Sequence, residues 1–337
     1  MQPLVSVLMP AYNAASFIRE AIESILGQSW TNFELLIYDD ASTDDTVSII
    51  ESFRDERISL YKKDKNTGYA DSLIHAVTTA KGDYIARMDS DDFSELNRLE
   101  KQISFLENNQ DYGIVGSFVE AILPEGSKQV WNFPVEDKDI RCYLIKDSPF
   151  AHPSVMIRKD ILMNNQLNYD IRYEPCEDYK LWFELLKVTK GKNLAEPLLH
   201  YRLHENQTIV LRREMLISNS NMIRGEVFEY MFGIHLSQEE LAANYKYFNE
   251  IKACGIKDIE HHYNWKKKIS SIILKAGYSE TYQQFVDSYW VTHLQTLSEF
   301  KPAFIKYLFK TSVAGHFSLA ATLKFLTKCM VSYKVKR

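Results

Sequence analysis

The sequence predicts an α/β fold in which a mixed, mostly parallel, Rossmann-like central sheet is flanked by helices and followed by a helical C-terminal extension. Three observations predict it. Over the first third of the 337 residues, short apolar runs alternate with stripes of helical period. A hydrophobic share of 45% is enough for a sizeable core. Beyond about residue 210 the pattern is helix-rich. Because strands joined by helices run parallel, we expect helices on both faces of the sheet.

The first part of the chain supplies four strands separated by helices. The predicted strands are residues 5–9, 34–38, 58–61 and 83–88. The helix after the first strand is expected to be capped by Ser16 and to stop at Gly27, and Thr43 is expected to cap the next helix. A third helical stripe should end at Lys81 and Gly82.

From about residue 112 the pattern becomes mixed. Strand candidates lie at 113–119, 154–157 and 198–203, and a helix is expected over 177–187. These patterns predict one domain over residues 1–209, with halves 1–111 and 112–209, followed by a helical extension over 210–337.

Charge and cysteine content exclude several classes of protein. Residues 301–337 hold eight basic and no acidic residues. Since the net charge of the whole chain is −5, residues 1–300 carry a net charge of −13. This negative charge argues against a nucleic-acid partner. The four cysteines form no CxxC pair, so no zinc site or disulfide framework is indicated. With no secretory signal pattern and no apolar run near the roughly 20 residues that span a bilayer, we expect a cytoplasmic protein.

Polar clusters follow each of the first four predicted strands. They comprise residues 10–13, 39–40, 66–68 and 89–92. In sheets of this type, ligands bind beyond the carboxyl ends of the strands, so these clusters should share one rim. Neither GxGxxG nor GxxxxGK[ST] occurs, which excludes the dehydrogenase and P-loop patterns.

The densest cluster is Asp89-Ser90-Asp91-Asp92. Three carboxylates in four residues are costly to bring together without a cation, and Mg²⁺ and Mn²⁺ take such oxygen ligands. The alternative is a solvated acidic turn that caps the helix near Arg98. Likewise, Asp39-Asp40 taken alone is more typical of a helix-capping loop than of a site.

Together these residues resemble the family 2 inverting glycosyltransferases with the glycosyltransferase A fold. The resembling stretches, in the family's order and spacing, are residues 5–13 (VSVLMPAYN), 33–46 (FELLIYDDASTDDT), 66–68 (NTG), 82–92 (GDYIARMDSDD) and 177–178 (ED). The resemblance covers roughly residues 4–205.

The resemblance implies a set of donor-side residues. The loop around the nucleoside would be Pro10, Ala11, Tyr12 and Asn13, with Asn66 and Gly68 beside it and Asp40 on the uracil ring. Asp91 would be the direct ligand of a divalent cation, Mn²⁺ or Mg²⁺, with Asp89 the second acid of the metal motif and nearer the ribose and phosphates. Arg87 and Ser90 would belong to the same donor site.

On the acceptor side, Asp178 resembles the general base that takes a proton from the acceptor hydroxyl. Without the resemblance, Glu177 and Asp178 are ordinary acids at a helix N-terminus. Further substrate contacts are expected from Asp92, His152, Glu177, Arg202 and His204. Arg202 could neutralise phosphate, a metal role for His204 stays open, and each histidine has a structural alternative.

The implied activity is transfer of a sugar from a nucleotide diphosphate sugar, with a UDP-sugar favoured, to a hydroxyl of a glycan or lipid-linked glycan. The enzyme would be of hexosyltransferase type and act in surface polysaccharide biosynthesis. The alternatives are a haloacid dehalogenase-type phosphohydrolase, which Phe93 disfavours, and a non-catalytic glycan-binding protein. A sugar-nucleotide pyrophosphorylase would need a glycine-rich loop that residues 9–13 lack.

The C-terminal residues 302–337 mix aromatic and aliphatic residues with lysines. This composition suits peripheral contact with an anionic membrane, which would place the enzyme at the inner face of the cell membrane. The alternative is a helical tail that packs on the main domain.

Overall fold

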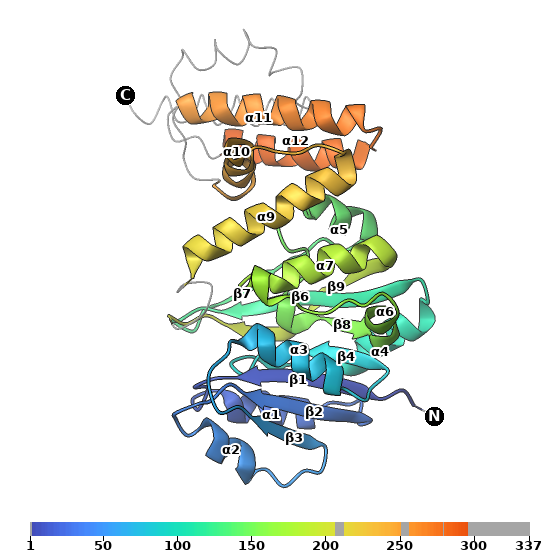
Figure 1. The fold of residues 1–337 in the computed structure, drawn as a ribbon, viewed down its shortest axis with the longest axis vertical. Coiled ribbons are helices and arrows are strands. Elements are labelled where there is room, and N and C mark those ends of the chain that lie inside the picture. The colour runs from blue at the N-terminus through green and yellow to red at the C-terminus, as the bar shows by residue number, and fades with distance from the viewer. Residues whose placement is uncertain (1, 206–211, 251–255, 279, 296–337) are drawn as a thin grey trace. The chain divides into compact units, whose positions relative to one another are not determined.

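The computed structural model describes residues 2–205, 212–250, 256–278 and 280–295 (Figure 1). The chain divides into two compact units, Met1–Ile223 and Arg224–Arg337. The strands found in the described residues all belong to the first unit. The predicted boundary at 209/210 remains a prediction.

Within the described residues, nine strands form one sheet with the order β3-β2-β1-β4-β8-β6-β9-β5, and β7 pairs with β6. The strands are β1 (Val5–Ala11), β2 (Phe33–Asp39), β3 (Ile58–Lys62), β4 (Tyr84–Arg87), β5 (Phe93–Ser94), β6 (Tyr112–Ile122), β7 (Lys128–Trp131), β8 (Met156–Arg158) and β9 (Lys190–Arg202). The first four strands run parallel, β8 is antiparallel to β4 and β6, and β6 runs parallel to β9. This arrangement confirms the predicted mixed, mostly parallel α/β sheet.

Helices cover both faces of this sheet (Figure 1). The helices of the first unit up to β9 are α1 (Ile18–Leu26), α2 (Thr46–Ser52), α3 (Tyr69–Thr79), α4 (Arg98–Asn108), α5 (Asp137–Tyr143), α6 (Lys159–Asn164) and α7 (Glu177–Val188), with short 3₁₀ turns at His152–Ser154 and Ile171–Tyr173. Alternate residues of β1 such as Val7 pack into one buried cluster with α1 and α4. The intervening Leu8 is equally buried on the α3 side, as the period of two requires.

Two predicted helix caps are wrong. The residue before α1 is Phe17 rather than Ser16, and it makes no side-chain capping bond. The backbone N–H of Ala14, in the loop before α1, donates to Thr46 Oγ1 at 2.8 Å. A residue of the next helix therefore supplies a hydrogen-bond acceptor to this loop. Helix α2 starts only at Thr46, so Thr43 lies outside it; Asp44 accepts the hydrogen bond from the Thr46 N–H at 3.0 Å.

Other boundaries also differ from the predictions. Gly27 does follow α1, but α3 ends at Thr79, before Lys81 and Gly82. Strand β9 starts at Lys190, eight residues before the predicted 198, because exposed and buried residues do not alternate cleanly in a strand with bulges. The predicted strand at 154–157 is a 3₁₀ turn followed by the shorter β8.

Helix α9 (Arg213–Phe232) carries the boundary between the units, and α10 (Gln238–Asn249), α11 (Ile256–Lys275) and α12 (Glu280–Gln295) follow, which confirms a helical C-terminal part. Ser237 and Glu240 form a capping box on α10. The Tyr247 hydroxyl donates to the Val286 carbonyl at 2.7 Å, and Lys266 pairs with Asp287 at 2.8 Å.

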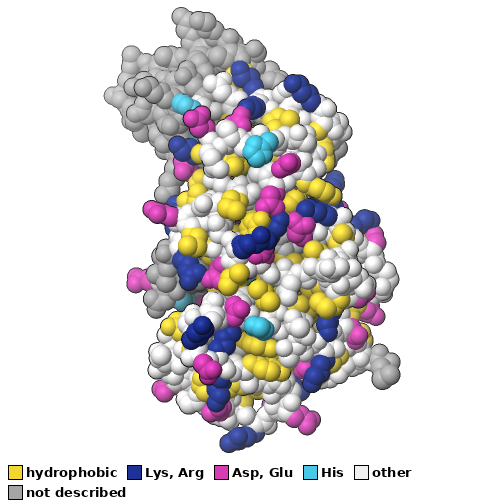
Figure 2. All heavy atoms as spheres, viewed as in Figure 1, with side chains coloured by type: hydrophobic (Ala, Val, Ile, Leu, Met, Phe, Trp, Pro, Cys, Tyr) yellow, Lys and Arg dark blue, Asp and Glu magenta, His cyan; other side chains and the backbone are white. Residues whose placement is uncertain are grey.

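In the described residues, no helix has the length and apolar character needed to cross a bilayer. Acidic and basic side chains are interspersed over the described surface of the face in Figure 2. The tail 302–337, for which the sequence predicts membrane contact, lies outside the described residues.

Candidate active site

The loops after β1 and β4 leave neighbouring strands at the point where the strand order reverses. Strand β1 has β2 on one side and β4 on the other. The chain therefore turns away in opposite directions from this pair, which is where open α/β sheets bind their ligands. The acid-rich loop that follows β4 lies at this point.

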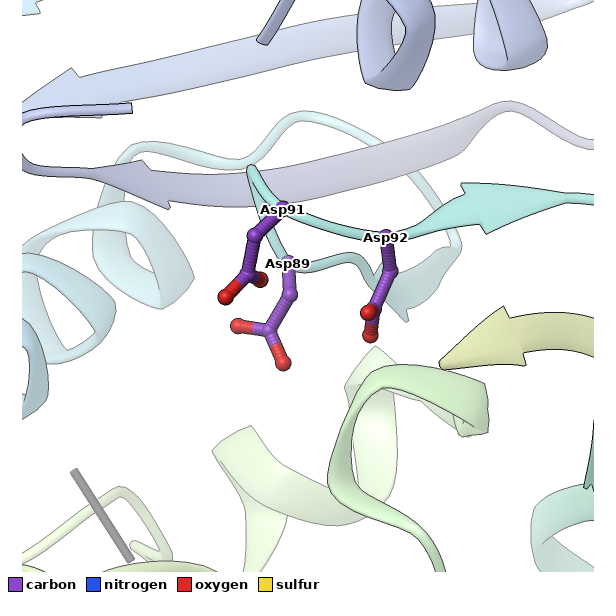
Figure 3. A group of neighbouring side chains, drawn as sticks. All are labelled: Asp89, Asp91 and Asp92. Atoms are coloured by element: carbon purple, nitrogen blue, oxygen red, sulfur yellow. The ribbon is translucent and has the colours of Figure 1, made fainter. Parts of the chain in front are cut away.

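The three acids of this loop converge. Asp89, Asp91 and Asp92 each offer a carboxylate oxygen, and these oxygens lie within 4.8 Å of one another. Figure 3 shows the Asp89 and Asp91 carboxylates side by side, with Asp92 farther along the loop. Asp92 is fully buried, and in the described part of the chain its Oδ2 has no hydrogen-bond partner. Ser90 lies partly exposed between the acids.

Burial and mutual repulsion make this cluster electrostatically unfavourable. Burial raises the pKa of Asp89, and the neighbouring Asp91 adds to the rise. For Asp92 the pKa is raised well above its usual range, again by burial first and then by Asp91 and Asp89. A hard divalent cation would relieve this repulsion, so the donor set fits Mg²⁺ or Mn²⁺.

Two buried arginines supply part of the missing positive charge. Arg87 forms an ion pair with Asp89; burial opposes its charge, but Asp89 outweighs this and raises the pKa of Arg87. Arg98, fully buried at the start of α4, donates to the Arg87 carbonyl at 2.5 Å and to Ser94 Oγ at 2.9 Å. Burial and the charge of Arg87 lower the pKa of Arg98 to about 9. Arg98 therefore holds the two ends of the acidic loop through the Arg87 carbonyl and the Ser94 hydroxyl.

The end of β9 closes over the same loop. The backbone N–H of Arg202 donates to Asp92 Oδ1 at 2.9 Å, and its guanidinium donates to the Asp91 carbonyl at 2.7 Å and pairs with Glu20. His204 Nε2 lies 2.9 Å from Asp91 Oδ2. Both predicted contact residues therefore meet the acidic loop, although Arg202 is already engaged with protein groups.

The loop after β1 is tied to the loop after β2. Pro10 and Ala11 are buried at the end of β1, whereas Tyr12 is 49% exposed. Asn13 has a positive φ of 47°, and its side-chain oxygen accepts a hydrogen bond from the Thr43 N–H at 2.9 Å. The Asn13 side chain therefore ties this loop to the loop after β2.

Asp40 joins the loop after β2 to that after β3. Its carboxylate accepts from the backbone N–H groups of Thr67 at 3.0 Å and Gly68 at 2.8 Å, and pairs with Lys63 at 3.1 Å. Gly68 has φ +95°, which favours glycine. Asn66 is exposed and accepts from the Gly68 N–H at 3.2 Å. Three of the predicted donor-side residues, Asp40, Asn66 and Gly68, thus form one hydrogen-bonded group.

The two acids at the start of α7 differ in environment. Asp178 is partly exposed and accepts a hydrogen bond from the Ser148 hydroxyl at 3.2 Å. Glu177 is 1% exposed and accepts from the Tyr69 hydroxyl at 2.9 Å. Burial raises the pKa of Glu177 to about 8 and that of Asp178 to about 6. Near neutral pH this leaves Asp178 as the carboxylate that can accept a proton.

His152 and Tyr169 lie between the acidic loop and α7. The Tyr169 hydroxyl is 3.0 Å from His152 Nε2, and His152 Nδ1 is 3.8 Å from Glu177 Oε1. Burial, followed by the charge of Arg87, lowers the pKa of His152 well below its usual range. Burial raises the pKa of Tyr169, with contributions from both Asp178 and Asp89. His152 is therefore neutral near pH 7 and contributes packing and a hydrogen bond with Tyr169 rather than a positive charge.

Several residues in these contacts had not been identified from the sequence. They are Glu20, Lys63, Tyr69, Ser148 and Tyr169. Only Tyr69 carried a local signal, because it directly follows Gly68 in one of the polar clusters. The others are common polar residues whose partners lie far away in the sequence.

Known structures with the same architecture identify the fold class. Residues 1–349 of S. aureus TarS in complex with UDP align with 86% of this chain and 90% of that chain at a TM-score of 0.54 and 16% identity. The Pyrobaculum calidifontis mannosyltransferase PcManGT, in complex with GDP-Man and Mn²⁺, aligns over 87% of this chain and 86% of its own chain, with a TM-score of 0.54 and 15% sequence identity. The fold of the chain is therefore of the glycosyltransferase A type.

The family follows from sequence comparison: the chain belongs to glycosyl transferase family 2, whose pattern matches residues 6–165. An uncharacterized glycosyltransferase of Haemophilus influenzae is 29% identical over 87% of this chain and 89% of its own length. Two relatives are from Escherichia coli. The UDP-Glc:α-D-GlcNAc-diphosphoundecaprenol β-1,3-glucosyltransferase WfaP is 31% identical over 66% of this chain and 86% of its own length. The O-antigen biosynthesis glycosyltransferase WbnJ is 33% identical over 61% of this chain and 82% of its own length. The protein is therefore a glycosyltransferase and neither a phosphohydrolase nor a non-catalytic glycan-binding protein.

Proposed function

We propose that this glycosyltransferase is a metal-dependent, inverting enzyme that moves a sugar from a UDP-sugar to a hydroxyl of a glycan or lipid-linked glycan in surface polysaccharide biosynthesis. The observation that carries the proposal is the convergence of three carboxylate oxygens within 4.8 Å at the reversal point of the sheet. The TarS structure holds UDP and the PcManGT structure holds GDP-Man and Mn²⁺, which supports a nucleotide-sugar donor.

The donor would lie along the hydrogen-bonded loops after β1, β2 and β3. Tyr12 offers an exposed ring to the nucleobase, and the buried Asp40 offers acceptor oxygens held in place by backbone N–H groups. Asp91 and Asp89 would hold Mn²⁺ or Mg²⁺, which when bound supplies positive charge to the departing diphosphate.

Asp178 would be the general base. It would take the proton from the acceptor hydroxyl as the oxygen attacks the anomeric carbon, while the bond from that carbon to the diphosphate oxygen breaks and the nucleoside diphosphate leaves. One displacement of this kind inverts the anomeric configuration. The hydrogen bond from Ser148 orients the carboxylate without neutralising it.

A donor screen tests this proposal. The protein is incubated with Mn²⁺, a panel of nucleotide sugars and a lipid-linked sugar acceptor. A suitable acceptor is α-D-GlcNAc-diphosphoundecaprenol, for which the relative WfaP is named. We expect release of UDP that requires the metal and is lost on chelation. Release that survives Asp91→Ala would contradict the metal role, and release from GDP-sugars alone would contradict the choice of donor.

A further inference from the structure

We propose that Tyr69 is a positioning residue for the catalytic base. By donating its hydroxyl to Glu177, it holds the first turn of α7, and with it Asp178, against the nucleotide-binding loops. This inference rests on the function proposed above, because Asp178 needs a fixed position only if it deprotonates an acceptor beside a bound donor.

Tyr69 is well placed to link the two halves of the site. It is the first residue of α3 and directly follows Gly68, whose N–H is bonded to Asp40. Its hydroxyl reaches Glu177 Oε2 at 2.9 Å, across 108 positions of sequence. One end of this contact is thus the candidate nucleoside loop, and the other is the neighbour of the candidate base.

A second close approach joins the same segments. A Cβ atom added to Gly68 would lie 2.8 Å from Glu174 Oε2, so this glycine allows Glu174 to sit directly against the loop. Helix α7 has no side-chain capping bond at Cys176. Without a cap of its own, this turn depends more on side-chain contacts such as those of Tyr69 and Ser148.

Glu177 depends on this hydroxyl. The side chain is 1% exposed, and its Oε1 has no hydrogen-bond partner in the part of the chain that the structure describes. Removing the Tyr69 hydroxyl would leave a buried carboxyl with poorer hydrogen bonding, which favours a shift of the turn towards new partners. Since Asp178 is the next residue, such a movement displaces the base.

The test compares Tyr69→Phe with Tyr38→Phe. Tyr38 is a matched control because it is buried and its hydroxyl also contacts α3, donating to Thr79 Oγ1 at 2.8 Å, at the far end of that helix. In steady-state transfer with Mn²⁺, we expect Tyr69→Phe to lower kcat about 10-fold or more and to leave KM for the donor within 2-fold, because a small misplacement of a base affects the chemical step. Tyr38→Phe should change neither.

Other results would overturn the proposal. Equal kcat values for the two variants would leave Tyr69 as a packing residue, and a raised donor KM with unchanged kcat would assign it to the nucleoside loop. If Tyr69→Phe does not fold, Glu177→Ala removes the same contact from the other side, and unchanged kcat in that variant counts equally against the proposal. A wild-type protein that releases no nucleoside diphosphate from any donor would instead refute the proposed function itself.

A double-mutant cycle tests the route through Glu177. If Tyr69 acts through this carboxyl, Tyr69→Phe should cost little further kcat in a Glu177→Ala background. Additive losses in the cycle would show that Tyr69 acts by another route.

Discussion

The Nε2 atom of His204 lies 2.9 Å from Oδ2 of Asp91, although 113 positions separate the two residues in the sequence. The His204 ring stacks on Phe17 with the ring centroids 5.2 Å apart, so the residues before α1, after β4 and after β9 meet at one point. A neutral imidazole has one nitrogen that donates and one that accepts, so Nε2 can either donate to Asp91 or offer a lone pair to a cation, depending on the tautomer. The contact thus places His204, which follows β9, beside the acidic loop that follows β4.

Asp91→Asn should weaken Mn²⁺ binding about 100-fold or more, since it removes a carboxylate from the candidate donor set. Isothermal titration with MnCl₂ in the presence of UDP measures this affinity. Asp111→Asn serves as control, because Asp111 is an exposed partner of Lys190 just before β6, at the opposite end of the sheet from the loop after β4. Equal affinities for the two variants would remove Asp91 from the metal site.

Asp178→Asn should lower kcat by roughly 10²–10⁴-fold, the range for a positioned general base, with little change in donor KM. The control is Glu184→Gln on the same helix, whose carboxylate pairs with Lys180 and Lys187. Steady-state transfer assays give both constants. A kcat loss shared by the control would point to damage to α7 instead of loss of a base.

Transfer should depend on pH through Asp178. Burial raises the pKa of this carboxyl to about 6, and a base works only when deprotonated. The value of kcat should therefore be flat above about pH 7 and fall as pH drops through 6, approaching 10-fold per unit below it. UDP binding measured at each pH separates this effect from loss of the donor. A rate that stays constant down to pH 5 would argue against Asp178 as the base.

Gly68→Ala should destabilise the first unit by about 2–3 kcal/mol, because a positive φ and a contact with Glu174 act together. Gly126→Ala is the matched control: φ is +85° there, but nothing lies within 4 Å of an added Cβ, so only about 1 kcal/mol is expected. Urea unfolding gives both free energies of unfolding. Equal losses would mean that Glu174 moves aside without cost.

Local sequence patterns were sufficient for the first four strands and for the family. The runs at 5–9 and 34–38 could be recognised as strands from their short, largely apolar character, and the structure confirms them as the buried strands β1 and β2. The acids after β4 stood out by density alone. The Ser16 and Thr43 caps failed because Thr46 and Asp44, neighbours in space rather than in sequence, satisfy those backbone groups.

The sequence by itself determined that this chain is an α/β glycosyltransferase with an acid-rich loop after its fourth strand. The tertiary structure alone decided which distant side chains meet: His204 with Asp91, Tyr69 with Glu177, and Ser148 with Asp178. The physical reason is that residue spacing reports burial along one element, whereas contacts between elements depend on strand order and register, here with β8, β6 and β9 inserted beyond β4.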